Sequence, residues 1–323
     1  MKKREDTFRG MIIVLALICA AAGLTLGATY RLTRGRIEAQ QQQERMAALG
    51  IVLPEAHKDG FLEIIVARGI VERLLGNALQ EHVGGSQRYV LVDQKTARRL
   101  YLLRNPAVEF DKYLGRLVEV MGPVREGVKD RRRKVGEGEG IPELSVLRIG
   151  RQLDATVPKP AFATDGRYYE AYDKPLAEAS RELLGYALEG SEIGYSSTIR
   201  VTVGVDPSAE IIRGIKITFQ QETPGLGANC EAVEPEGTLW DALVGKLKQT
   251  AQLEPRFQAG FHEKRADSFR MVGNKYQVKV GDEYQEIDGM TGATITKNAV
   301  ISAVLDAVEE FKERVLKTDV ATK

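Results

Sequence analysis

A long uncharged segment near the N-terminus sets the first constraint on how this chain folds. No charged side chain occurs between Gly10 and Tyr30, and about 20 helical residues cross the hydrocarbon layer of a bilayer. We therefore predict a retained transmembrane helix at residues 11–29. A cleaved secretory signal peptide is the alternative, but its apolar part normally covers only about 7–15 residues, and Leu26-Gly27-Ala28 is a poor cleavage site.

The segment that follows is expected to remain helical. Ile37–Leu49 is rich in glutamine, glutamate and alanine, which favour a helix that carries the chain away from the bilayer. This helix is expected to end before Pro54. Basic residues flank the uncharged segment on both sides, so the distribution of positive charge does not decide its orientation.

The composition of the chain argues against several classes of function. Lysine and arginine number 46 and aspartate and glutamate 45, so no overall positive field marks the chain as a nucleic-acid binder. The two cysteines, Cys19 and Cys230, are not expected to form a disulfide or a metal site. The three histidines are scattered and have no metal-ligand spacing. We predict no metal site and no catalytic residue.

Residues 61–156 are predicted to form an inserted small β-barrel module. After a predicted helix at Ile64–Leu79, turn signals separate four short strands, which are predicted at Arg88–Asp93, Arg99–Leu103, Leu117–Met121 and Leu144–Ile149. The stretch Tyr113–Val124 resembles a segment of small bacterial OB-fold modules, in which a short turn leads into a long bent strand.

A basic run at Lys129–Lys134 lies within this module. OB-folds often bind oligonucleotides, but the run has no interleaved aromatic residues and is followed by a glycine- and glutamate-rich stretch. We therefore favour a solvated loop, or a contact with a protein or a membrane surface, and predict no nucleic-acid partner.

Residues 160–318 have the pattern of an α+β domain. Alternating apolar residues predict strands, and a further helix is predicted at Thr238–Ala251. The strands are expected at Tyr168–Tyr172, Leu184–Leu188, Ile199–Val205 and Ile211–Phe219. The glycines of the segment Glu222–Gly227 do not form a dinucleotide-binding G-x-G-x-x-G pattern, so from its spacing alone this segment is only a turn.

The stretch Asp288–Thr296 opens a long amphipathic helix. Apolar residues recur at three- and four-residue steps from Val300 to Val315, and Thr296 or Asn298 is expected to cap the helix start. Thr294 would then lie just ahead of the helix, where free N–H groups and the helix dipole favour an anion. From physical chemistry alone, a glycine- and threonine-rich turn of this kind is more often structural.

Two motifs make the chain resemble the RnfG subunit of the Rnf complex and the NqrC subunit of sodium-pumping NADH:quinone reductase. The first is D-x-x-[ST]-G-A-[ST], which is filled here by Asp288, Thr291, Gly292, Ala293 and Thr294. The second is E-T-P-G-L-G, which includes Glu222, Thr223, Gly225, Leu226 and Gly227. In the family, the final threonine of the first motif carries FMN as a phosphoester, which gives that role to Thr294, and the second motif lines the flavin pocket.

The resemblance implies an α+β FMN-binding domain with one N-terminal transmembrane helix and an inserted OB-like module. It divides the chain into a cytoplasmic tail (residues 1–10), the span (residues 11–29), a juxtamembrane helix with the start of the flavin domain (residues 30–60), the insertion (residues 61–156) and the FMN-binding domain (residues 160–318). Relatives of this kind lack the insertion, and they do not indicate what it does.

The implied function is electron transfer in an ion-translocating ferredoxin:NAD complex. The chain would be a phosphoester-modified redox subunit rather than a stand-alone catalyst, with the bilayer, other membrane subunits and a flavin transferase as partners. Its flavin domain would lie outside the cytoplasm, at the inner membrane. Asp288 would either help to present the threonine hydroxyl or form an Asx turn. The alternatives are a flavin subunit of another membrane reductase and a membrane-anchored module without flavin.

Overall fold

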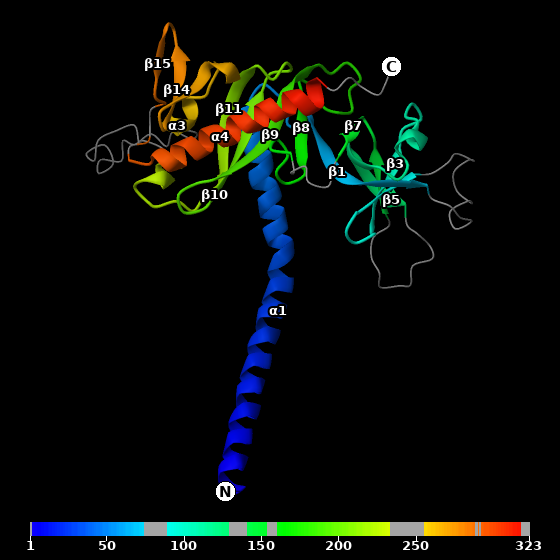
Figure 1. Cartoon of the computed structure of the whole chain (residues 1–323), viewed down its shortest axis with the longest axis vertical. Helices are drawn as coiled ribbons and strands as arrows, with labels where there is room; N and C mark the ends of the chain where they lie inside the picture. Colours follow the sequence, from blue (N-terminus) through cyan, green and yellow to red (C-terminus); the bar gives the residue numbers. More distant parts are fainter. Residues whose placement is uncertain are drawn as a thin grey trace. The chain divides into compact units, whose positions relative to one another are not determined.

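The structure is a computed structural model, and it describes residues 2–73, 89–128, 141–153, 160–232, 255–287, 290 and 292–317. The helix predicted at Thr238–Ala251 and the basic run at Lys129–Lys134 lie outside the described residues. The chain divides into two compact units, Met1–Ala47 and Ala48–Lys323. Helix α1, Lys2–Val52, provides the described residues of the first unit, and its last residues, from Ala48, belong to the second (Figure 1).

Helix α1 contains both helices that the sequence predicts in this region. It runs without a break through residues 11–29 and Ile37–Leu49 and ends before Pro54, as expected. In the part of the chain that the structure describes, no helix is long and apolar enough to cross a membrane. The structure does not describe the side chains of residues 11–14 and Leu17, which belong to the predicted span. The span itself stays a prediction.

The second unit is built around one large mixed sheet. Among the described residues this sheet has twelve strands, ordered β12-β11-β10-β9-β8-β1-β2-β3-β6-β5, with β4 paired to β1 and β7. Its strands are β1 Phe61–Arg73, β2 Tyr89–Val92, β3 Arg99–Arg104, β4 Leu117–Gly122, β5 Val124–Val128, β6 Ile141–Ser145, β7 Arg148–Gln152, β8 Arg167–Tyr172, β9 Leu183–Ile193, β10 Thr198–Val205, β11 Ile211–Phe219 and β12 Lys264–Arg265.

Several short elements complete the second unit. A separate sheet, which the sequence analysis did not predict, joins β13 Phe269–Val272, β14 Lys275–Val280 and β15 Glu283–Gln285. The remaining elements are η1 Phe110–Tyr113, η2 Gly227–Glu231, α3 Arg256–Ala259, η3 Ala266–Ser268, α4 Thr294–Phe311 and the π-helical turn η4 Lys312–Leu316. Strands β8 to β11 and helix α4 confirm the four strands and the C-terminal helix predicted for residues 160–318.

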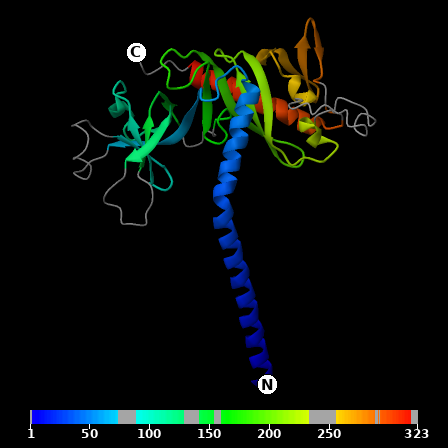
Figure 2. The same cartoon turned by 180° about the vertical axis from the view of Figure 1, so that it is seen from behind.

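Helix α4 covers one face of strands β8 to β11. It lies in front of these strands in Figure 1 and behind them in Figure 2. Its apolar stripe faces the sheet, with Val300, Val304 and Phe311 fully buried. Gly190 on β9 permits this close packing, because a Cβ there would lie 2.3 Å from the carbonyl oxygen of Ala303.

The opposite face of the same strands is covered by the end of α1. Successive side chains of a strand point to opposite faces, so Tyr168 packs edge-on against Phe311 of α4, whereas its neighbour Tyr169 faces away from that helix. Tyr169 belongs to a second buried cluster that includes Leu49 and Val52. The sheet is therefore buried on both faces where β8 and β9 run.

Strand β1 replaces the helix predicted at Ile64–Leu79, and that prediction was wrong over residues 64–73. Its β-branched residues favour a pleated strand, and buried positions alternate with less buried ones along part of it. The first half of β1, Phe61–Ile65, pairs with β8, while its second half pairs with β4 and β2. One strand therefore belongs to both halves of the sheet. Residues 74–79 lie outside the described part.

Strands β2 to β7 extend the sheet beyond β1. Strands β1, β2 and β3 are antiparallel, β3 is parallel to β6, β6 pairs with β5, and β4 returns to pair with β1. The predicted strands at Arg88–Asp93, Arg99–Leu103 and Leu117–Met121 are confirmed as β2, β3 and β4. The one predicted at Leu144–Ile149 is divided into β6 and β7, which are separated by Val146 and Leu147.

Candidate functional site

Thr294 is the first residue of helix α4, not a residue ahead of it. Ala293 occupies the position before the helix and makes no side-chain capping bond, so the predicted cap by Thr296 or Asn298 was wrong. Both side chains bond elsewhere: Thr296 to Glu222, and Asn298 to the backbone of Asn274. The first N–H groups of an α-helix have no intrahelical partner, so Thr294, which is partly exposed, lies where an anion is favoured.

The structure brings the two sequence motifs together. Gly292, next to the start of α4, has a positive φ of 74°, which glycine adopts readily. A Cβ at Gly292 would lie 3.4 Å from Cδ2 of Leu226 in the Glu222–Gly227 loop. Asp288, Gly289 and Thr291 of the first motif lie outside the described residues.

The carboxylate of Glu222 lies at the centre of this arrangement and is only 6% exposed. Its Oε2 accepts hydrogen bonds from Oγ1 of Thr296 (2.6 Å) and from the N–H of Tyr195 (3.2 Å). Its Oε1 accepts from the N–H groups of Ser196 (2.9 Å) and Ser197 (3.0 Å). Burial alone would raise the pKa of Glu222, but the Thr296 hydroxyl and these backbone N–H groups outweigh it and lower the pKa below its usual value.

Two glycines leave room for this carboxylate. A Cβ at Gly194 would lie 2.6 Å from Oε1 of Glu222. A Cβ at Gly227 would lie 2.8 Å from Oε2 and 2.6 Å from Oγ1 of Thr296. Any larger side chain would displace these atoms, which explains why glycine is needed at the end of the second motif.

Exposed apolar side chains belong to the segments that meet at the start of α4. Leu226 and Ile295 flank the start of α4 and are 46% and 55% exposed. Tyr195, whose backbone N–H binds Glu222, is 71% exposed. Sequence analysis missed Tyr195, which lies in an unremarkable turn between β9 and β10. Exposed apolar side chains of this kind suit a flat aromatic ligand.

A cluster of two lysines and one carboxylate lies beside the first turn of α4. Lys297 is 7% exposed, and its Nζ is 3.5 Å from Oε2 of Glu286. Lys275 shares that carboxylate, with Nζ 2.8 Å from Oε1. The hydrogen bond from Lys275 is the main reason that the pKa of Glu286 is lowered. The cluster thus holds two lysines and one carboxylate, while the ionised Glu222 carboxylate lies against the same helical turn through Thr296. Nothing in the sequence spacing indicated this cluster.

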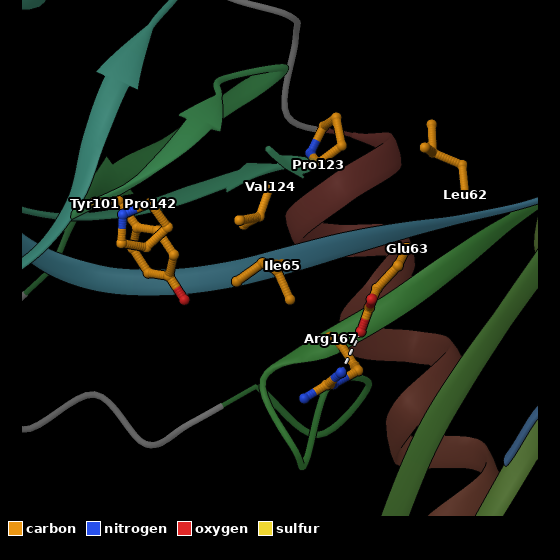
Figure 3. Close-up of a pocket in the computed structure, with 8 residues that line it drawn as sticks. All are labelled: Leu62, Glu63, Ile65, Tyr101, Pro123, Val124, Pro142 and Arg167. Atoms are coloured by element: carbon orange, nitrogen blue, oxygen red, sulfur yellow. Dashed lines mark hydrogen bonds and ion pairs between the residues drawn. The ribbon is translucent and has the colours of Figure 1, made fainter. Parts of the chain in front are cut away.

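A cavity of about 400 Å³ lies elsewhere, beside strand β1. It is lined by Leu62, Glu63, Ile65, Tyr101, Pro123, Val124, Pro142 and Arg167. Figure 3 shows Glu63 and Arg167 pointing toward each other as an ion pair. No residue of either motif lines this cavity. Among the described residues, no group of histidine, cysteine and acidic side chains is arranged to hold a metal ion.

The comparisons with known proteins agree with the motifs. Residues 194–309 match the FMN-binding domain family. The chain is 30% identical over 134 residues to the G subunit of the proton-translocating ferredoxin:NAD(+) oxidoreductase complex of Clostridium ljungdahlii, which covers 42% of this chain and 57% of that protein. It is 33% identical over 139 residues to the G subunit of the ion-translocating oxidoreductase complex of Aliivibrio fischeri, with 42% and 54% covered.

Among solved structures, the chain matches the C subunit of the Na(+)-translocating NADH-quinone reductase from Parabacteroides distasonis. The identity is 20%, the TM-score is 0.29, and the match covers 50% of this chain and 69% of that one. The chain spans a little over half the length of the two curated relatives above. Residues 194–309, which contain both sequence motifs, thus match the FMN-binding domain family, and the resemblance of the chain to the G subunits of Rnf-type complexes is confirmed.

Proposed function

We propose that this chain is an electron-transfer subunit that carries FMN as a phosphoester on Thr294, in an ion-translocating complex of the Rnf type. The observation that carries the proposal is the position of Thr294. It is the first residue of α4, it is partly exposed, and the Glu222–Gly227 loop lies beside it. The choice of complex rests on the relative from the ferredoxin:NAD(+) oxidoreductase complex.

The residues around Thr294 fit the phosphate and the ring of FMN. Unpaired N–H groups of the first turn and the helix dipole favour a phosphate at Thr294. Lys297, in the first turn of α4, and Lys275 place two ammonium groups on this side of the helix start. Leu226, Ile295 and Tyr195 supply apolar surface for an isoalloxazine ring. When bound, FMN supplies the redox chemistry, while the chain binds it and orients it.

Attachment would require a flavin transferase that uses FAD. Oγ1 of Thr294 would form a new bond to the phosphorus of the FMN half, the pyrophosphate linkage of FAD would break, AMP would leave, and the hydroxyl proton would pass to water. No oxidation or reduction takes place in this step. Asp288 and Thr291 of the same motif are proposed to belong to the flavin site, with Asp288 helping to present the hydroxyl of Thr294.

The proposal extends to the membrane and to the inserted module. Residues 11–29 would anchor the chain in the inner membrane beside other membrane subunits, with residues 1–10 in the cytoplasm and the flavin domain outside it.

Residues 61–156 would form the OB-like module. The pairing order β1-β2-β3-β6-β5, with β4 back on β1, supports this. It is the order of a five-stranded OB barrel when β4–β5 and β6–β7 each count as one bent strand.

Flavin fluorescence after denaturation tests the proposal. The full chain is expressed with and without a flavin transferase, denatured and separated on a gel. The expected result is a fluorescent band only with the transferase, and none for Thr294→Ala. A wild-type band that loses all its flavin on denaturation would contradict covalent attachment.

A further inference from the structure

We propose that Glu222 is a positioning residue, which holds the start of α4 so that the hydroxyl of Thr294 is presented for modification. This inference rests on the proposed function of Thr294. Glu222 does not itself contact Thr294 in any described hydrogen bond. It acts through Thr296, which lies two residues further along the same helical turn.

The carboxylate joins three segments that are distant in the sequence. Through Thr296 it holds the first turn of α4, and through Tyr195, Ser196 and Ser197 it holds the turn between β9 and β10. The N–H of Glu222 is itself held by the side chain of Gln220, at 2.8 Å. The start of α4 therefore has a fixed position relative to the loop that contains Leu226.

Fixing Thr296 also fixes Thr294. Residues within the first turn of a helix share one rigid backbone geometry, and the N–H of Lys297 bonds back to the carbonyl of Ala293 at 2.9 Å. The turn from Ala293 to Lys297 is therefore closed. If Thr296 lost its bond to Glu222, the whole turn, including Thr294, would gain freedom to move away from the Glu222–Gly227 loop.

Only an ionised carboxylate satisfies all these partners. Each of the five groups around Glu222, among them the hydroxyl of Ser197 at 3.4 Å, donates a hydrogen bond, and among the ion pairs of the described residues none includes Glu222. A glutamine would place its NH₂ group against one of these donors. Glu222→Gln therefore keeps the size of the side chain but breaks at least one link.

The test measures FMN transfer from FAD to the full-length apoprotein by a flavin transferase. Initial rates at increasing acceptor concentration separate kcat from KM, at a temperature where circular dichroism shows each variant to be folded. We expect Glu222→Gln and Thr296→Val to lower kcat by at least about tenfold, because a displacement of about 1 Å is costly for a positioned nucleophile. KM should change little.

Two variants serve as controls. Thr296→Ser keeps the hydroxyl and should restore the wild-type kcat. Thr202→Val makes the same substitution at a hydroxyl that is 1% exposed and has no hydrogen-bond partner among the described atoms, so its kcat should equal the wild-type value. If Glu222→Gln does not fold, the Thr296→Val and Thr296→Ser pair decides.

Each result then has one meaning. Folded Glu222→Gln and Thr296→Val proteins that are modified at the wild-type kcat would overturn the inference, as would a rise in KM alone. Wild-type protein that takes up no covalent FMN would overturn the proposed function itself. Modification that persists in Thr294→Ala would place the attachment elsewhere.

Discussion

Glu119 on β4 and Arg314, just beyond helix α4, lie 3.6 Å apart between Oε2 and Nη1, although 195 positions separate them in the numbering. The carboxylate of Glu119 is 2% exposed and also binds Nε of Arg68 on β1 at 2.8 Å. Close by, Arg148 on β7 donates to the carbonyl of Val315 at 3.2 Å. The helix that starts at Thr294 is therefore held at its far end by the inserted strands.

Removal of the Glu119 carboxylate should weaken the whole second unit. Glu119→Ala leaves Arg68 and Arg314 without this partner in a half-buried setting, so we expect the free energy of unfolding to fall by about 3 kcal/mol. Urea denaturation measures the change. Glu109→Ala is the matched control, because its partner Lys112 is 72% exposed and exposed ion pairs contribute little. Equal midpoints for the two variants would refute a structural role of Glu119.

Deletion of the inserted strands should be tolerated only if the first half of β1 is kept. Removing residues 67–158 keeps Phe61–Ile65, which pair with β8, so we expect a folded, less stable protein that still takes up covalent FMN. Removing residues 60–158 also removes that pairing, so the protein should unfold at a clearly lower temperature. Thermal melts monitored by circular dichroism, with flavin incorporation measured on both proteins, make the comparison. If the protein that lacks residues 67–158 folded but took up no covalent FMN, the insertion would contribute to the flavin site.

Stability should fall in acid partly because of Glu222. Its pKa in the folded protein is lower than in the unfolded chain, so the folded state binds fewer protons and the carboxylate stabilises it above the unfolded pKa. This contribution is lost as the pH falls from about 4.5 through the lower folded pKa. Denaturation midpoints from pH 7 to pH 3 should drop less steeply for Glu222→Gln than for wild type. If the midpoints of the wild type and of Glu222→Gln fell equally with pH, Glu222 would not be a source of the acid sensitivity.

The anchor makes a separate prediction about solubility. The uncharged segment Gly10–Tyr30 is proposed to hold the chain in the bilayer, so a protein that lacks residues 1–30 should appear in the soluble fraction after ultracentrifugation. The full chain should appear in the membrane fraction, and alkaline carbonate washing should not release it. Recovery of the truncated protein with membranes, in cells without partner subunits, would contradict the anchoring role.

Sequence patterns predicted the elements whose apolar periodicity is strong. Strand β11 has the expected bounds, Ile211–Phe219, because apolar and polar residues alternate over its last five positions, as in a strand. The same reasoning failed over residues 64–73 of the helix predicted at Ile64–Leu79, where a run of apolar residues with little alternation also fits a helix. Tertiary pairing with β8, β2 and β4 decided in favour of a strand.

The contacts of the candidate site were less predictable. The two motifs were recognised separately, but the bond between Glu222 and Thr296 joins residues 74 positions apart, and no local pattern encodes such a contact. Thr296 instead had the sequence features of a helix cap. Lys275 and Glu286 also escaped notice, because their pairing depends on the short strands β14 and β15, which carry weak patterns.

The mass of the peptide that contains Thr294 tests the central claim most directly. The full chain is produced with a flavin transferase, denatured, digested and analysed by mass spectrometry with fragmentation. The account predicts that this peptide gains the mass of one FMN less one water, with the added group on Thr294. Thr294→Ser should retain the addition and Thr294→Ala should lose it. An unmodified Thr294 peptide, or FMN on Thr291 or Thr296 instead, would contradict the account.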